Sequence, residues 1–206
     1  MRRGILGGAF NPPHIGHLIC AQEALLRLSL ERMAFVPVGR APHRGIEGDP
    51  GAESRLEMCR RAAAGDERLD VLRLEIDREG PSYTVDTLRE LRERDPEDEL
   101  VLVLGGDQAA TLPTWHAPEE VLGLAEVAVV PRTGYSREAV AVKIARLRGA
   151  QHIRFFDMPR IGVSSTMVRR RVARGEPIRY LVPAPVGDYI VQQGLYGAAV
   201  PAGAEG

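Results

Sequence analysis

Short apolar runs alternate with amphipathic stretches along almost the whole chain. The amphipathic stretches predict helices at His17–Leu28, Ser54–Ala64, Thr84–Arg94, Arg137–Leu147, Ser164–Ala173 and Val186–Gly194. The apolar runs predict strands at Gly4–Leu6, Met33–Val38, Leu69–Leu74, Leu100–Leu104, Val127–Val130 and Ile153–Phe156. This alternation predicts an α/β fold with a doubly wound, Rossmann-like parallel sheet and helices on both faces, whose ligands bind at the carboxyl ends of the strands.

Neither an internal repeat nor a linker divides the chain, so a single domain over residues 1–197 is expected. The tail, residues 198–206, is small and Gly-rich, and we expect it to be disordered. The 206 residues, 44% hydrophobic and 27% charged, are enough for a sizeable core and are typical of a globular protein.

The charge balance and the cysteines exclude several classes of protein. Lys and Arg number 27 against 28 Asp and Glu, so a general nucleic-acid binder is not supported and an anionic ligand needs a local cluster of donors. Cys20 and Cys59 give neither a disulfide framework nor a zinc-ligand set. Residues 11–14 interrupt the N-terminal apolar stretch, and no apolar run approaches the roughly 20 residues of a membrane span. We therefore expect a cytoplasmic protein without a membrane partner.

The densest chemical signal follows the first predicted strand, in Gly7-Gly8-Ala9-Phe10-Asn11-Pro12-Pro13-His14-Ile15-Gly16-His17. Paired glycines before a helix allow backbone N–H groups to approach a phosphate. The glycines alone also fit a plain turn, and the two histidines fit partly buried polar residues or metal ligands. A zinc site needs a third ligand, which this segment lacks. Phosphate binding is the interpretation that explains both the glycines and the histidines.

This segment resembles the G-G-T-F-D-P-x-H-x-G-H signature of the nucleotidyltransferases with the H-x-G-H motif. Five further segments are similar, in order, to motifs of the bacterial nicotinate-nucleotide adenylyltransferases. They are Pro37–Arg44 (P-x-x-x-P-P-H-K), Ser82–Leu88 (S-Y-T-x-D-T-L), Gly105-Gly106-Asp107 with Leu112 and Trp115 (G-x-D and L-x-x-W), Val163–Arg169 (I-S-S-T-x-I-R) and Tyr180–Pro183 (Y-L-V-P). The resemblance spans roughly the whole chain.

The resemblance implies transfer of the adenylyl group of ATP to nicotinate mononucleotide, a step of NAD biosynthesis, with Mg²⁺ carried on the ATP. It implies catalytic roles for His14, His17 and Arg169, with His17 nearest the α-phosphate. The implied ATP-binding residues also include Gly7, Gly8, Ala9, Phe10, Gly105, Asp107, Ser165 and Thr166. The residues suggested for the acceptor are Arg44, Thr84, Trp115 and Arg132. The mechanism needs no protein-bound metal site, since positioning and charge stabilisation carry phosphoryl-type transfers.

Several of these residues also fit an ordinary structural role. The run Ser164–Thr166 is a good helix N-cap, as are Asp107 and Thr84, and Arg169 lies in a basic run typical of a solvated face. Trp115 also fits a core or hinge position.

The chain departs from the family pattern at three positions: Ala9 replaces Thr, Asn11 replaces Asp and Arg44 replaces Lys. Asn11 removes a charge close to the triphosphate. Two other functions stay open, namely another H-x-G-H adenylyltransferase acting on nicotinamide mononucleotide or phosphopantetheine, and a non-catalytic nucleotide-binding regulator. The sequence does not predict an oligomeric state.

Overall fold

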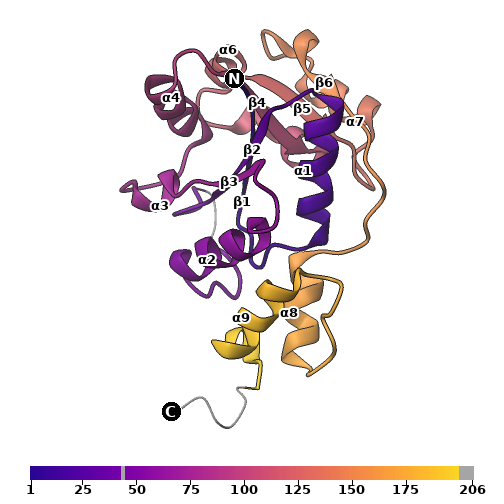
Figure 1. Cartoon of the computed structure of the whole chain (residues 1–206). Helices are drawn as coiled ribbons and strands as arrows, with labels where there is room; N and C mark the ends of the chain where they lie inside the picture. Colours follow the sequence, from indigo (N-terminus) through magenta and orange to yellow (C-terminus); the bar gives the residue numbers. More distant parts are fainter. Residues whose placement is uncertain (43–44, 200–206) are drawn as a thin grey trace.

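A six-stranded parallel sheet forms the centre of the computed structural model, which describes residues 1–42 and 45–199 (Figure 1). The strand order is β3-β2-β1-β4-β5-β6. The chain starts in the middle of the sheet, adds β2 and β3 on one side of β1, and then adds β4, β5 and β6 on the other side, so the switch point lies between β1 and β4. The strands are β1 (Arg2–Gly8), β2 (Arg32–Pro37), β3 (Leu69–Val71), β4 (Glu99–Gly105), β5 (Glu126–Val130) and β6 (Arg154–Phe155). The predicted Rossmann-like α/β fold is confirmed.

Helices follow the strands, and each predicted helix is present, together with three short helices that the sequence pattern did not predict. They are α1 (Ile15–Arg27), α2 (Ala52–Ala63), α3 (Leu74–Asp77), α4 (Thr84–Arg94), α5 (Gly106–Ala109), α6 (Pro118–Leu124), α7 (Arg137–Ile144), α8 (Ser165–Ala173) and α9 (Ala184–Gln192). Three short 3-10 turns lie at η1 (Leu112–Thr114), η2 (Ala150–His152) and η3 (Leu195–Gly197).

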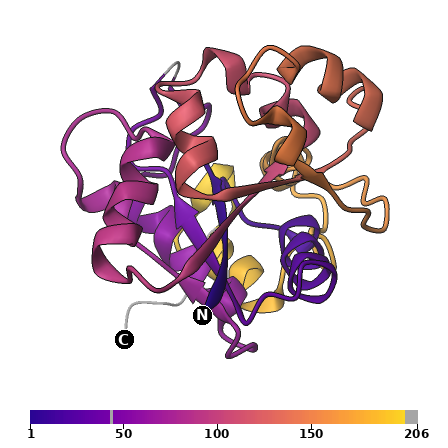
Figure 2. The ribbon, with the colours of Figure 1, turned by 90° about the horizontal axis from the view of Figure 1, so that it is seen from above.

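Neighbouring residues of each central strand pack into different hydrophobic cores because side chains alternate across a sheet. Ile5 packs with α4, α6 and α7 in one core, whereas Leu6 packs with α1 and Cys59 of α2 in the other. Figure 2 shows these helices on the two sides of the strands. Both faces of the sheet are therefore covered, which fits the nearly continuous apolar sequences of β4 and β5.

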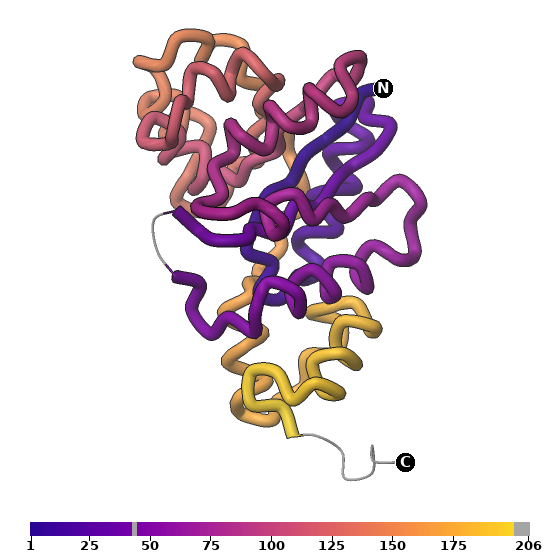
Figure 3. Tube along the Cα trace, turned by 90° about the vertical axis from the view of Figure 1, so that its left-hand side faces the viewer, coloured from indigo at the N-terminus to yellow at the C-terminus, as the bar shows by residue number. Residues whose placement is uncertain are grey.

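The C-terminal helices form a third apolar cluster beyond the carboxyl ends of the strands. Val168 and Val172 of α8 pack with Val186 and Ile190 of α9 against Met58 of α2. Figure 3 shows α8 and α9 together at one end of the molecule. This packing holds the start of α8 close to the segment that follows β1, where Ser165 Oγ donates a hydrogen bond to the Pro12 carbonyl at 2.8 Å.

Two parts of the predicted pattern are wrong. The strand predicted over Leu69–Leu74 ends at Val71, because β3 is an edge strand whose pairing stops opposite Phe35; Leu74 instead starts α3 and is buried in the core. The helix α6 was not predicted, although Pro118 in its first turn, followed by Glu119 and Glu120, is a typical helix start. Of the predicted tail, Ala198 and Ala199 are irregular, and residues 200–206 lie outside the described residues.

Over the part of the chain that the structure describes, the helices are too short or too polar for any of them to cross a bilayer. The longest, α1, has 13 residues.

Candidate active site

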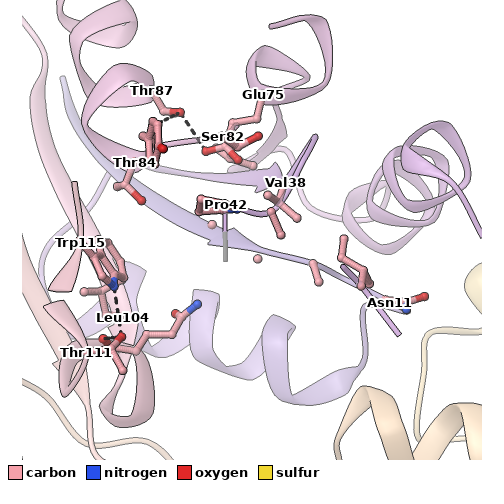
Figure 4. A pocket seen from close by; sticks show the side chains of 18 of the residues that line it. Asn11, Val38, Pro42, Glu75, Ser82, Thr84, Thr87, Leu104, Thr111 and Trp115 are labelled. Carbon is pink, nitrogen blue, oxygen red and sulfur yellow. Dashed lines mark hydrogen bonds between the residues drawn. The ribbon is translucent and has the colours of Figure 1, made fainter. Parts of the chain in front are cut away.

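One cavity of about 580 Å³ opens at the carboxyl ends of β1, β2 and β4. Its wall combines Gly7, Gly8 and Ala9 after β1, Thr84 of α4, Trp115, and Ser165, Thr166 and Arg169 of α8. Figure 4 shows Trp115 and Thr84 at one end of this space and Asn11 at the other. Segments that are far apart in the sequence thus enclose one space large enough for a nucleotide-sized ligand.

His14 and His17 form a reciprocal cap at the start of α1. The backbone N–H of Gly16 donates to Nδ1 of His14, and the backbone N–H of His14 donates to Nδ1 of His17, each at 3.1 Å. The two rings lie 3.9 Å apart between centroids. Because both Nδ1 atoms accept hydrogen bonds, each neutral imidazole carries its proton on Nε2. Two Nε2–H donors are therefore left to bind an anion.

Both histidines are uncharged near neutral pH in the ligand-free protein. Burial, with a smaller contribution from the positive charge of Arg132, lowers the pKa of His14 from 6.5 to about 4. Burial also lowers the pKa of His17 well below its ordinary value, helped by His14 and Arg132. A bound triphosphate would oppose these effects, since a nearby anion favours the charged imidazole.

The start of α8 presents a second group of donors to the cavity. Ser164 is the N-cap, and its Oγ accepts a hydrogen bond from the Met167 N–H at 3.2 Å, so capping does not occupy Ser165 or Thr166. The Ser165 hydroxyl itself donates to the Pro12 carbonyl. Arg169 donates to the Asn11 carbonyl at 2.9 Å and pairs with Glu47 at 3.2 Å. Glu47 is 89% exposed in its side chain, so this pair lies at the solvent edge and is easily replaced by a phosphate.

Asn11 is buried, and both ends of its side-chain amide are engaged. Its Nδ2 donates to the carbonyls of Glu47 at 2.8 Å and Gly48 at 3.3 Å, and its Oδ1 accepts from the Tyr196 hydroxyl at 2.7 Å. Burial raises the pKa of Tyr196, so this hydroxyl keeps its proton. Asn11 therefore ties the segment that follows β1 to the C-terminal turn η3.

The far end of the cavity is more open and more aromatic. Trp115 is half-buried, and its Nε1–H donates to Thr111 Oγ1 at 3.1 Å. Tyr83 and His116 stack at 4.6 Å between ring centroids. Thr84 begins α4, and no side chain caps this helix. The Asp86 N–H donates to the Tyr83 carbonyl at 3.1 Å, so the N–H groups of Thr84 and Val85 are the ones that remain to receive an anion.

Several predicted site residues lie outside the lining of this cavity. His14, His17, Gly105, Asp107 and Arg132 lie beside it, and Asp107 is in the first turn of α5 with its Oδ1 3.7 Å from Arg132. A Cβ at Gly105 would come 2.6 Å from Asp107 Oδ1 and 2.9 Å from Arg132 Nε, so a larger residue here would displace these two side chains.

Phe10 and Arg44 need separate comment. Phe10 is 2% exposed, with its ring against His17 and Phe35, so only its backbone is left for ATP. Arg44 lies outside the described residues.

Sequence reasoning missed a buried polar group in the cavity wall. Glu75 is buried and accepts a hydrogen bond from Thr87 Oγ1 at 2.8 Å, and burial raises its pKa. Ser82 Oγ accepts from the N–H groups of Gly39 at 3.2 Å and Arg40 at 3.1 Å. Ser82 and Thr87 belong to the motif Ser82–Leu88 and were recognisable from it, whereas an isolated Glu75 gave no signal.

The described residues hold no group of three His, Cys, Asp or Glu side chains that could bind a metal ion. The acidic groups that line the cavity are Glu47 and Glu75. Glu75 is hydrogen bonded to Thr87, and Glu47 pairs with Arg169.

Comparisons with known proteins agree with this geometry. The cytidylyltransferase-like family model matches residues 5–171. A probable nicotinate-nucleotide adenylyltransferase of Geobacillus thermodenitrificans is 41% identical over 95% of this chain and 86% of its own length. One from Thermus thermophilus is 43% identical over 95% of this chain and all of its own. The fold is shared with the nicotinic acid mononucleotide adenylyltransferase of Plasmodium falciparum solved with NaAD, at 16% identity, a TM-score of 0.79, and coverage of 97% and 99% of the two chains.

Proposed function

We propose, because this chain belongs to the nicotinate-nucleotide adenylyltransferase family of cytidylyltransferase-like proteins, that it transfers the adenylyl group of ATP to nicotinate mononucleotide. The products are nicotinate adenine dinucleotide and pyrophosphate, and the reaction belongs to NAD biosynthesis. The observation that supports this most is that one cavity joins Ser165 and Arg169, which we assign to the phosphates, to Trp115 and Thr84.

In the proposed reaction, a phosphate oxygen of the acceptor attacks the α-phosphorus of ATP and the bond to the β-phosphate breaks. Two anions must meet, and two like unit charges 4 Å apart repel by about 4 kcal/mol at an effective dielectric of 20. The Nε2–H groups of His14 and His17 are assigned to the reacting phosphate, and Arg169 with the start of α8 to the leaving pyrophosphate. Fixed donors of this kind stabilise the charge that grows in the transition state.

Mg²⁺ is proposed to enter with ATP, bound mainly by phosphate oxygens and water. The chemistry that it supplies is neutralisation of the phosphate charge during transfer. Asn11, which stands where the family pattern has an acid, carries no charge and is hydrogen bonded to Tyr196. The protein's own contribution is therefore the set of N–H donors.

The acceptor is proposed to bind at the other end of the cavity, with its pyridine ring on Trp115 and its carboxylate at the start of α4. Free N–H groups there, with the Thr84 hydroxyl, satisfy two carboxylate oxygens. An amide would turn its NH₂ group toward these donors and leave both unpaired. One such mismatch costs roughly 1–3 kcal/mol, which corresponds to about a tenfold to hundredfold preference for the acid.

The test is a substrate panel with purified protein, ATP and Mg²⁺. Nicotinate mononucleotide, nicotinamide mononucleotide and phosphopantetheine are each supplied, and both pyrophosphate and the dinucleotide product are measured. We expect the highest kcat/KM with nicotinate mononucleotide. Equal kcat/KM values for the acid and the amide would contradict the acceptor assignment but would still support adenylyl transfer. If no acceptor gives pyrophosphate, the protein is better explained as a non-catalytic nucleotide-binding protein.

A cytoplasmic location is part of the same proposal.

A further inference from the structure

Arg55 of α2 is a charged side chain with no exposed surface. Its guanidinium contacts three separate segments. Nε donates to Asp49 Oδ1 at 2.9 Å, Nη1 donates to the Ala9 carbonyl at 3.1 Å, and Nη2 donates to the Gly39 carbonyl at 3.4 Å. Ala9 follows β1 and Gly39 follows β2, so one side chain joins the loops that leave two neighbouring strands.

In the proposed reaction, each of these two loops lies beside a different substrate. Ala9 belongs to the segment assigned to the phosphates of ATP, whereas Gly39 leads into Ala41 and Pro42 on the cavity wall near α4. The loops also meet directly, since the Val38 N–H donates to the Gly8 carbonyl at 2.9 Å. Arg55 adds a second connection just beyond this bond.

Gly39 is fixed from every side. Its N–H donates to Ser82 Oγ and its carbonyl accepts from Arg55. A Cβ at this position would lie 1.9 Å from the Glu75 carbonyl oxygen, so only glycine allows the backbones to approach this closely. A shift of the Arg55 guanidinium would therefore be passed to Gly39, which lies between Val38 and Ala41 of the cavity wall.

We propose that Arg55 is a positioning residue that holds the phosphate loop and the acceptor loop at a fixed separation. The inference rests on the proposed function. The planar guanidinium donates from three nitrogen atoms held at fixed positions, which the one nitrogen of a lysine ammonium cannot reproduce. Attack of the acceptor on the α-phosphorus depends on this separation, and a misplacement of about 1 Å can cost 10²-fold in rate.

A purely structural role explains the contacts less well. Asp49, the ionic partner, is one-third exposed, and a buried ion pair is on average no more stabilising than apolar packing of the same volume. Both remaining partners of Arg55 are loop carbonyls beside the cavity, not groups of the core.

The test compares Arg55→Lys with Arg61→Lys, a control on the same helix whose arginine pairs with Glu57 at 2.8 Å. For Arg55→Lys we expect kcat to fall about tenfold to a hundredfold and both substrate KM values to rise. Arg61→Lys should match the wild type. In the ligand-free protein, hydrogen exchange should become faster in residues 7–12 and 38–42 of the Arg55 variant.

Unchanged kinetics and exchange with only a lower Tm would overturn the proposal. If Arg55→Lys does not fold, the variant Asp49→Ala keeps the arginine but removes the partner of its Nε. The same slower turnover and faster hydrogen exchange are then expected. Normal turnover in Asp49→Ala would also overturn the proposal. Exchange in the ligand-free protein separates the two proposals. A wild type without activity on nicotinate mononucleotide would remove the function, whereas the exchange result still measures whether Arg55 holds the loops.

Discussion

The two ends of the cavity are built differently. At the end that we assign to the phosphates, Arg169 of the cavity wall and the adjacent His14 and His17 are each already hydrogen bonded to backbone groups, so their orientation is set before any ligand arrives. At the acceptor end, Trp115 is half-buried and has only a threonine as its hydrogen-bond partner, and the stacked His116 is exposed. Fixed donors suit a transition state, whereas a more open aromatic wall suits recognition of a ring. Changes at the two histidines should therefore affect kcat, changes at Arg169 should affect ATP binding, and changes at the second end should affect the KM for the acceptor.

The largest effect is expected for His17. His17→Ala removes the Nε2–H donor that we assign to the reacting phosphate, and loss of one such donor costs about 10²–10³ in kcat. The KM for ATP should change much less. His17→Gln, which keeps an oxygen to accept the His14 N–H, separates this loss from the loss of the helix cap. Near-normal kcat in steady-state assays of His17→Ala would remove this residue from the mechanism.

The burial of His14 has a consequence for stability at acidic pH. Its pKa in the folded protein, about 4, lies below its unfolded value of 6.5, so the unfolded chain binds more protons as the pH falls. The free energy of unfolding should decrease between pH 6.5 and 4, by up to about 3 kcal/mol from this group. Denaturant unfolding at several pH values measures it.

His14→Asn keeps an N-cap side chain and should flatten this dependence. His152→Asn, at an exposed position, should leave it in place. If the free energy of unfolding of His14→Asn depends on pH as steeply as that of the wild type, burial does not hold the His14 imidazole neutral.

The third effect concerns Arg169. Arg169→Ala should weaken ATP binding while leaving binding of nicotinate mononucleotide nearly intact, since hydrogen bonds to charged groups are worth about 1.5–3 kcal/mol, or roughly tenfold to a hundredfold in Kd. Arg170→Ala, on the same helix but exposed, is the control. Calorimetric titration with each ligand checks both. Equal losses for the two ligands together with a lower Tm would show that Arg169 acts mainly through its bond to the Asn11 carbonyl.

Local patterns predicted the elements and the motif residues, but not the contacts that orient them. The helix Thr84–Arg94 was predicted with its observed bounds because its apolar face repeats along a single segment. The bond between Asn11 and Tyr196 joins positions 185 residues apart, which no local period records.

Arg55 gives a weak signal in the sequence. It lies four residues before Cys59, on the buried face of a helix where a charge is out of place. A charged residue on an apolar face marks a buried partner, but which loops it joins depends on the tertiary fold.

The smallest effect is expected at the acceptor end. Trp115→Ala should raise the KM for nicotinate mononucleotide about tenfold, because stacking of a base on an aromatic side chain is worth roughly 1–3 kcal/mol, and should leave the KM for ATP unchanged. Trp115 also packs against the core on one face of the sheet, so its loss can lower Tm as well. Leu122→Ala is the matched control, since Leu122 packs against the same core but does not line the cavity. If both variants lose stability and only Trp115→Ala loses acceptor affinity, the ring is recognised by Trp115. If the two variants are kinetically alike, Trp115 is a core residue and the open end of the cavity recognises its acceptor through α4 alone.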